Sequence, residues 1–196
     1  MSEAGLQIGV ARARARAATN APRATEGTPP TPARVDAAAV REALAEVMDP
    51  ELPMLSVVDL GIVHRVEVTP GDGPIRVEIL PTFIGCPALE FIKTSISTRL
   101  GVFGRSVQVT ATFEIPWTSE RISENGRRCL LEAGIAPPGG GAPVAVGGLI
   151  DLEPRVSCPH CGSRRTTLEN LFGPTQCRTV RYCADCRQPF EAIKSV

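Results

Sequence analysis

The 196-residue sequence has few aromatic side chains, no net charge and no long apolar run. Aromatic residues make up 4% of the chain, so a core must be built mainly from Val, Ile, Leu and Ala. The balance of 21 basic and 21 acidic residues argues against a dedicated binder of polyanions. No apolar stretch approaches the roughly 18 residues of a membrane span, and the N-terminus lacks the apolar region of a secretory signal. We therefore expect a protein of the cytoplasm that does not associate with membranes.

Composition divides the chain into four parts. Residues 1–35 are rich in Ala, Arg, Thr and Pro and lack a sustained apolar period. Their Ala-Arg repeat slightly resembles a transit peptide, but we expect a disordered extension. A domain over residues 36–135, a flexible linker rich in Gly and Pro over 136–153, and a cysteine-rich module over 154–196 follow.

Apolar periodicity predicts the order helix, strand, strand, helix, strand, helix within the domain. The predicted ranges are a helix from Asp36 to about Met48, strands over 62–68 and 75–79, a helix over 87–100, a strand over 107–115 and a helix over about 119–133. This order is typical of an α+β fold in which a small mixed sheet is packed with helices. Strand alternation places His64 on the apolar face with Val66 and Val68, where a core histidine is expected rather than a ligand.

Cys86 stands between Gly85 and Pro87, where a strand should lead into a helix. Proline is favoured in the first helical turn. The free N–H groups and dipole of a helix start stabilise an anion, and they would lower the pKa of a thiol placed there. A small buried thiol of the core fits the same position equally well.

Four cysteines of the tail form two Cys-x-x-Cys pairs with 21 residues between them: Cys158, Cys161, Cys183 and Cys186. Two such pairs complete a tetrahedral site, which predicts a structural zinc ribbon. A redox dithiol pair and an iron–sulfur centre are the alternatives, and Cys177 and His160 are further candidate ligands. Gly162 suits the left-handed turn after the first pair, whereas Arg187 suits the equivalent turn after the second pair less well.

Three blocks of the domain resemble the SufT-like iron–sulfur assembly domain: Asp49-Pro50-Glu51-Leu52-Pro53, residues 56–63 and residues 81–88. The tail adds Cys158-Pro159-His160-Cys161-Gly162-Ser163, residues 172–177 and residues 183–190. Together these motifs make residues 36–194 similar to the D-subunit family of the bacterial phenylacetyl-CoA epoxidase. The chain departs from that pattern in its extension, in its linker and at Ser195, where the family carries a cysteine.

The resemblance implies a non-catalytic subunit that helps to mature a metal centre of the epoxidase. The expected partners are the di-iron oxygenase component and the iron–sulfur flavoprotein reductase. The reactive cysteine of the family corresponds to Cys86, which would deliver iron or an iron–sulfur unit transiently, since soft thiolates suit this chemistry. One domain cysteine cannot hold a cluster alone, so a homodimer or a ligand from a partner is implied. Candidate accessory ligands are Asp49, Glu51, Asp59, Thr82 and Cys177, although the three carboxylates fit a helix stop and loop solvation at least as well.

Three other functions stay open at this stage. One is a general factor of iron–sulfur cluster assembly. Another is a zinc ribbon that binds nucleic acid, which the scarcity of aromatic residues for base stacking disfavours. The third is an enzyme with Cys86 as covalent nucleophile, for which His64 is the one candidate base outside the tail. We expect no catalytic residue, zinc as a structural cofactor and iron as transient cargo.

Overall fold

The structure, a computed structural model, describes residues 35–139, 144–146, 149–151 and 156–195. Of the predicted disordered extension, residues 1–34 lie outside the described residues, as does much of the predicted linker, whereas Val35 packs against the core. Within the described ranges, no helix has the length and apolar character needed to cross a membrane.

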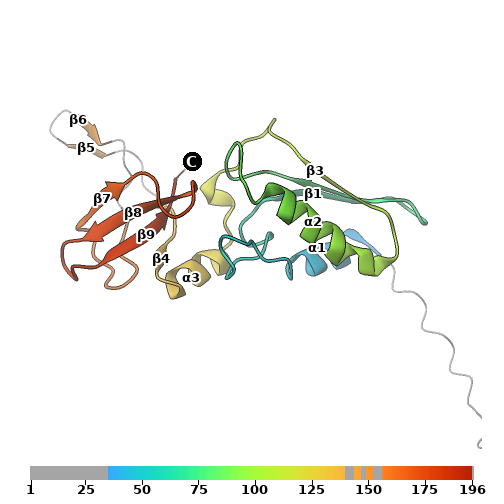
Figure 1. Ribbon diagram of the computed structural model, residues 1–196, viewed down its shortest axis with the longest axis horizontal. Helices are drawn as coiled ribbons and strands as arrows, with labels where there is room; N and C mark the ends of the chain where they lie inside the picture. Colours follow the sequence, from blue (N-terminus) through green and yellow to red (C-terminus); the bar gives the residue numbers. More distant parts are fainter. Residues whose placement is uncertain (1–34, 140–143, 147–148, 152–155, 196) are drawn as a thin grey trace, which may run out of the picture. The chain divides into compact units, whose positions relative to one another are not determined.

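A three-stranded sheet covered by two helices forms the first part of the described chain (Figure 1). Its strands are β1 (Val63–Val68), β2 (Ile75–Ile79) and β3 (Val107–Ala111), in the order β1-β2-β3. β1 runs antiparallel to β2, whereas β2 runs parallel to β3. A parallel pair needs a crossover, which is α2 (Leu89–Leu100). α1 (Ala37–Leu44) contacts α2 and β1, and the predicted α+β class with a small mixed sheet is confirmed.

The core of this part forms from the residues that the sheet and the helices turn toward each other. Alternate residues of β2 are buried, namely Ile75, Val77 and Ile79. On α2, the buried stripe is Ile92, Ile96 and Leu100, as the helical spacing predicted. α2 continues into the 3-10 turn η1 (Gly101–Phe103), and Gly104, with φ 66°, ends it.

α1 begins as predicted and ends earlier. The Oδ1 atom of Asp36 accepts hydrogen bonds from two N–H groups of the first turn, at 3.0 and 2.9 Å, and thereby caps the helix. The helix ends at Leu44 instead of Met48. The reason is that residues 47–49 pair with residues 55–57: the N–H of Val57 bonds to the carbonyl of Val47 at 2.8 Å, and Met48 forms a bridge with Ser56. This pairing requires extended backbone.

His64 lies at an irregularity of its strand. The pairing of β1 with β2 shifts register between Val63 and Arg65, so that His64 is the extra residue of a bulge. Val63, Val66 and Val68 pack against the core, and His64 is half-buried.

β3 is shorter than predicted. It ends at Ala111 instead of residue 115. Phe113 and Ile115, which lie in the part of the predicted strand that does not form, are 57% and 47% exposed.

The single helix predicted over residues 119–133 is two elements, the 3-10 turn η2 (Ser119–Arg121) and α3 (Glu124–Glu132). Thr118, which precedes η2, makes no capping hydrogen bond with its side chain. Ser123 caps α3 instead, because its Oγ accepts the N–H of Gly126 at 2.9 Å. The helix stops before Gly134, which has φ 76°, as predicted.

A second sheet of four strands has the order β4-β9-β8-β7. Its strands are β4 (Ile135–Ala136), β7 (Thr166–Asn170), β8 (Arg178–Cys183) and β9 (Pro189–Ile193). β4 pairs with β9 in parallel, and the other neighbours are antiparallel. β5 (Val144–Val146) and β6 (Leu149–Asp151) form a separate antiparallel pair. Ala136, where the predicted linker begins, thus lies in a strand, and Ile193 belongs to the core of the first part.

Gly61 tests how closely the loop before β1 packs, and Gly71, in the turn between β1 and β2, serves as its control. Gly61 and Gly71 both have positive φ, 72° and 66°. A Cβ at Gly61 would lie 2.2 Å from the carbonyl oxygen of Arg121, whereas a Cβ at Gly71 would meet nothing within 4 Å. We expect Gly71→Ala to lower the free energy of unfolding by about 1 kcal/mol through backbone strain. Gly61→Ala adds overpacking of about 1–3 kcal/mol to the same strain.

Urea denaturation of the two variants and the parent measures this difference. Equal losses in Gly61→Ala and Gly71→Ala would contradict the close approach of Arg121 to the loop.

Candidate functional site

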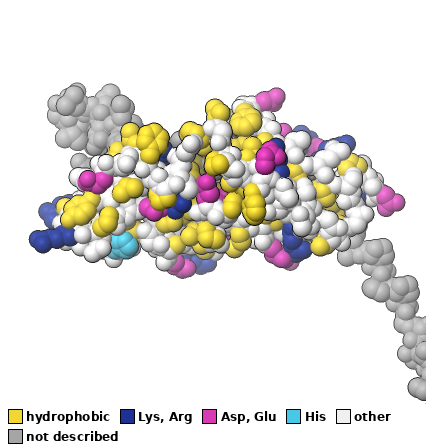
Figure 2. Space-filling view, viewed as in Figure 1, with side chains coloured by type: hydrophobic (Ala, Val, Ile, Leu, Met, Phe, Trp, Pro, Cys, Tyr) yellow, Lys and Arg dark blue, Asp and Glu magenta, His cyan; other side chains and the backbone are white. Residues whose placement is uncertain are grey.

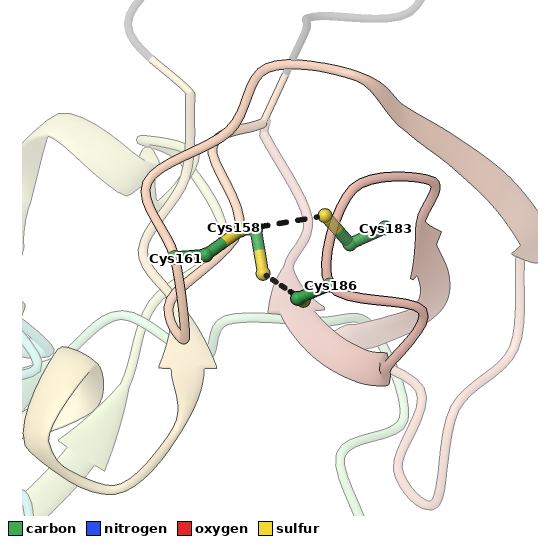
Figure 3. Close-up of side chains that lie close together, drawn as sticks. All are labelled: Cys158, Cys161, Cys183 and Cys186. Carbon is green, nitrogen blue, oxygen red and sulfur yellow. Dashed lines mark hydrogen bonds between the residues drawn. The ribbon is translucent and has the colours of Figure 1, made fainter.

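The four cysteines of the two Cys-x-x-Cys pairs lie together at one end of the second sheet: Cys158, Cys161, Cys183 and Cys186 (Figure 3). Their sulfur atoms all lie within 4.8 Å of one another, and the pairs Cys158–Cys186 and Cys161–Cys183 are 3.6 Å apart. Zinc–sulfur bonds of about 2.3 Å in a tetrahedron place the sulfurs about 3.8 Å apart. The group therefore fits one tetrahedral metal ion.

Both cysteine pairs use the same turn. The N–H of Gly162 bonds to the carbonyl of Cys158 at 2.9 Å, and the N–H of Arg187 bonds to the carbonyl of Cys183 at 2.9 Å. Gly162 has φ 74° and Arg187 has φ 58°, which makes Arg187 the one non-glycine residue with positive φ in the described ranges. The backbone of Arg187 is strained, because a side chain disfavours the left-handed conformation. This conformation gives the second pair the same turn as the first.

Charge is distributed unevenly among the four thiols. The backbone N–H of Cys186 lowers the pKa of Cys183 to about 6, whereas burial is the main cause that raises the pKa of Cys186 to about 12. Four thiolates this close cannot all ionise without a cation, and a bound metal ion would remove that limit.

The two further candidate ligands of the tail lie elsewhere. The Sγ of Cys177 is 3.1 Å from the Oγ1 of Thr175, and Cys177 lines a pocket against the first part of the chain. The imidazole of His160 lies against Gly134, where a Cβ would be 3.3 Å from its Cε1 atom. The group of ligand atoms therefore consists of the four paired cysteines.

The pocket beside Cys177 gathers most of the candidate residues of the domain. Its polar lining consists of Asp49, Glu51, Thr82, Cys86 and Cys177, and its remaining lining is apolar. The free space within it is about 20 Å³, which is room for about one water molecule.

Cys86 lies one turn before its helix. The N–H of Cys86 bonds to the carbonyl of Phe83 at 3.2 Å, in a turn that Gly85 permits with φ 83°. α2 begins at Leu89 instead of residue 87. The predicted lowering of the thiol pKa is wrong: burial raises the pKa of Cys86, and the charges of Glu51, Asp49 and Cys177 raise it further. These effects exceed that of the N–H of Ala88, which lowers it.

Two carboxylates stand beside this thiol. Asp49 is buried, and its Oδ1 accepts the N–H groups of Glu51 and Leu52 at 2.8 and 2.9 Å. Burial raises the pKa of Asp49 in spite of these bonds and of the charge of Arg178. Burial and the charge of Asp49 raise the pKa of Glu51.

Asp59 is not part of the pocket lining. The hydroxyls of Ser56 and Ser123 donate to its two oxygens at 2.9 and 2.6 Å. Although burial raises the pKa of Asp59, the hydrogen bonds from Ser123, Ser56 and Asn125 hold it below its usual value. Asp59 therefore ties its loop to the start of α3.

Two residues of the site carry no signal in the sequence. Arg178 forms an ion pair with Glu191 at 2.7 Å, and its Nη2 donates to the carbonyl of Glu51 at 3.4 Å. Trp117 is buried in the pocket wall, with its Nε1 donating to the carbonyl of Leu60 at 3.0 Å. These contacts join residues far apart in the chain, so local spacing cannot reveal them.

Apolar side chains are exposed on both sides of Cys86 in the sequence. Phe83 and Ile84 of the preceding turn are 43% and 81% exposed, and Phe91 of α2 is 59% exposed. Figure 2 shows hydrophobic side chains among polar ones over the middle of the visible face. Exposed aromatic and aliphatic side chains of this kind are common at surfaces that bind other proteins.

Sequence models of two families match the chain. The model described as "Iron-sulfur cluster assembly protein" matches residues 37–111, and the model described as "PaaD zinc beta ribbon domain" matches residues 145–194. The fold and the cysteine group thus define an iron–sulfur cluster assembly domain joined to a β-ribbon with a metal site. A protein of Escherichia coli (strain K12), which is named as the D-subunit of 1,2-phenylacetyl-CoA epoxidase, is 36% identical over 154 residues. The match covers 78% of this chain and 89% of that protein, so the chain belongs to the PaaD family.

Two solved structures are also similar. A DUF59 domain of unknown function from Bacillus anthracis is 26% identical, with a TM-score of 0.44, over 47% of this chain and 89% of that one. The conserved hypothetical protein TM0487 from Thermotoga maritima is 31% identical, with a TM-score of 0.42, over 48% of this chain and 92% of that one. Both TM-scores lie below 0.5, so the family assignment rests on the sequence matches.

The environment of Cys86 predicts slow labelling at neutral pH. The thiolate is the reactive form of a cysteine. Burial and the nearby carboxylates raise the pKa of Cys86, so the thiol stays protonated at pH values above its ordinary pKa. We expect the labelling rate of Cys86, followed by peptide mapping across pH, to rise only above the ordinary thiol pKa of about 8.5. Glu51→Gln removes one negative charge, so it should move this rise to lower pH. An unchanged profile in Glu51→Gln would mean that Glu51 does not act on the thiol.

Proposed function

We propose that this chain is a non-catalytic maturation subunit of a phenylacetyl-CoA epoxidase, which delivers iron or an iron–sulfur unit to an oxygenase component through Cys86. The observation that carries the proposal is the position of Cys86, half-buried in a pocket that also holds two carboxylates. The name of the E. coli relative and the description of the assembly family support the pathway and the chemistry.

The parts of the chain divide this work in the proposal. The domain over residues 36–135 carries the cargo, the module over 154–196 is a zinc-stabilised ribbon, and residues 136–153 connect them. The exposed side chains Phe83, Ile84 and Phe91 offer a contact surface for the recipient, which is the di-iron oxygenase or the iron–sulfur flavoprotein reductase. Close cysteine pairs that bind a metal are typical of reducing compartments, so we place the protein in the cytoplasm.

A carrier fits Cys86 better than a covalent nucleophile does. A thiol with a raised pKa is mostly protonated at neutral pH and attacks slowly. His64, the candidate base, is not in the pocket lining, and the carboxylates beside Cys86 disfavour its thiolate. A metal ion would reverse this balance, because its charge favours loss of the proton.

A general factor of iron–sulfur cluster assembly is the second candidate. The description of the family that matches residues 37–111 favours it. The two functions differ in their recipients: a general factor would serve iron–sulfur proteins outside phenylacetate degradation as well.

We propose zinc as the ion of the four-cysteine group. A closed set of four thiolates leaves no open position, which is typical of structural zinc sites. Both turns of the group hold their thiols by backbone hydrogen bonds, which also suits a permanent ligand set.

We expect one zinc ion per chain, and Cys183→Ser should lose it, because Cys183 is fully buried within the group. Elemental analysis of purified protein measures the zinc. Cys177→Ser is the matched control in the same ribbon and should keep full zinc. A full complement in Cys183→Ser would assign the ion to other ligands.

The delivery role is tested with Cys86→Ala. Removing one sulfur from a half-buried turn costs little packing, so the variant should fold and keep its zinc. Produced together with the other epoxidase components, it should give an assembled complex with little turnover. The deficit should appear as missing iron in a partner, measured by elemental analysis of each separated component, and substrate affinity should stay the same.

Cys129→Ala is the control, since Cys129 lies on α3 and packs against the core. Parental iron content and turnover in the Cys86→Ala complex would show that the delivery role is wrong. The remaining contribution of the domain would then be docking.

A further inference from the structure

The pocket brings together two cysteines from parts of the chain that match two different families. Cys86 precedes α2 in the assembly domain, and Cys177 precedes β8 in the ribbon. Both line the same pocket, and neither belongs to the four-cysteine group. Cys177 is therefore a thiol of the ribbon that takes no part in the metal site of the ribbon. It lines the same pocket as Cys86, the cargo thiol of the domain.

Contacts on three sides hold Cys177 in this place. Its carbonyl accepts the N–H of Lys194 at 2.9 Å, and its Sγ is 3.1 Å from the hydroxyl of Thr175. The next residue, Arg178, reaches across to the carbonyl of Glu51 in the assembly domain. The position of the thiol is thus set by the docking of the ribbon on the loop that carries Glu51.

Four groups that can lose a proton crowd around this pocket: Asp49, Glu51, Cys86 and Cys177. Burial raises the pKa of each one. The nearby positive charge of Arg178 lowers the pKa of Asp49, Glu51 and Cys177, but it does not offset the burial. A bound divalent cation would supply the missing positive charge and let the thiols ionise.

The size of the pocket favours one ion. Its free space of about 20 Å³ accommodates about one water molecule, which is too little for a preformed cluster with several iron and sulfide atoms. Its ligand atoms are also less closely gathered than those of the ribbon. In the described ranges, the four ribbon cysteines form the one group of three or more ligand atoms gathered closely enough to hold an ion, all within 4.8 Å of one another. A site that closes only around its ion binds it less tightly than a preorganised site, as delivery requires.

Resting on the proposed delivery role, we propose that Cys86 and Cys177, with Glu51 beside them, bind a single divalent ion of the ferrous type as cargo. Two thiolates with a carboxylate suit an ion of intermediate softness. Each coordinating thiol releases its proton to solvent, and no electron is transferred. The second thiol comes from the same chain, so two-thiolate binding needs neither a homodimer nor a ligand from a partner.

The test uses full-length, zinc-loaded protein titrated with Co²⁺ without oxygen, with Co²⁺ as the probe for a ferrous ion. The parent should bind one cobalt ion beyond its zinc and show a thiolate-to-cobalt absorption band. Cys86→Ser and Cys177→Ser should each weaken cobalt binding at least about tenfold, the loss that even an outer-shell partner can cause. Each should also lose about half of the band, because one of the two thiolates is gone.

Cys129→Ser, whose thiol lies on α3 and packs against the core, is the matched control and should bind cobalt as the parent does. Zinc content and circular dichroism before and after titration show that each variant is folded and that cobalt has not replaced zinc. Cys177→Ala serves as a second variant if Cys177→Ser is unfolded.

The outcomes separate this inference from the delivery role. Parental cobalt binding in Cys177→Ser, with weakened binding in Cys86→Ser, would overturn the two-thiol site and leave delivery through Cys86 intact. No second ion in the parent would also overturn the site. Weakened binding in both variants, together with normal iron in the Cys86→Ala complex, would support the site and remove the delivery role.

Discussion

The ribbon depends on the attraction between four thiolates and one metal ion. Its buried cluster has five members from the ribbon and Ala136 of β4, and two of the five, Cys158 and Cys183, are thiols of the metal site. So few buried side chains cannot offset the conformational entropy lost when about 40 residues become ordered. The strands that carry Cys177 and Ile193 to the pocket belong to this ribbon, so the surroundings of Cys86 depend on the same ion.

The two parts of the chain are joined by backbone pairing as well as by side chains. β4, which directly follows α3, pairs in parallel with β9, the last strand of the ribbon. Ile135 and Ile193 from these strands belong to the core of the first sheet. A polar contact between Arg178 and the loop of Glu51 adds to this apolar contact. Most of the pocket lining comes from the first part of the chain, and the ribbon completes it with Cys177 and Ile193.

Sequence reasoning succeeded where the signal is local. The cap at Asp36, the buried stripe of α2 and the grouping of the four ribbon cysteines all depend on residues close in the chain or on fixed spacing. It failed where a distant partner decides. The bulge at His64 is a property of the pairing of β1 with β2.

The thiol at the centre of the site shows the same limit. The expected pKa of Cys86 considered its own helix start, whereas burial and charges from the loop of Glu51 and from the ribbon set it. Cys177 was a candidate accessory ligand from the sequence, but its place beside Cys86 follows from how the ribbon docks, which local spacing does not determine.

β8 also sets the distance between the four-cysteine group and the pocket. Cys177 directly precedes this six-residue strand, and Cys183 is its last residue. At about 3.3 Å per residue, the two thiols are held about 20 Å apart along a rigid element. Thiol ligands at such a separation cannot pass an ion directly from one to the other. In the proposed arrangement, the strand therefore keeps the cargo ion of the pocket apart from the zinc ion of the ribbon.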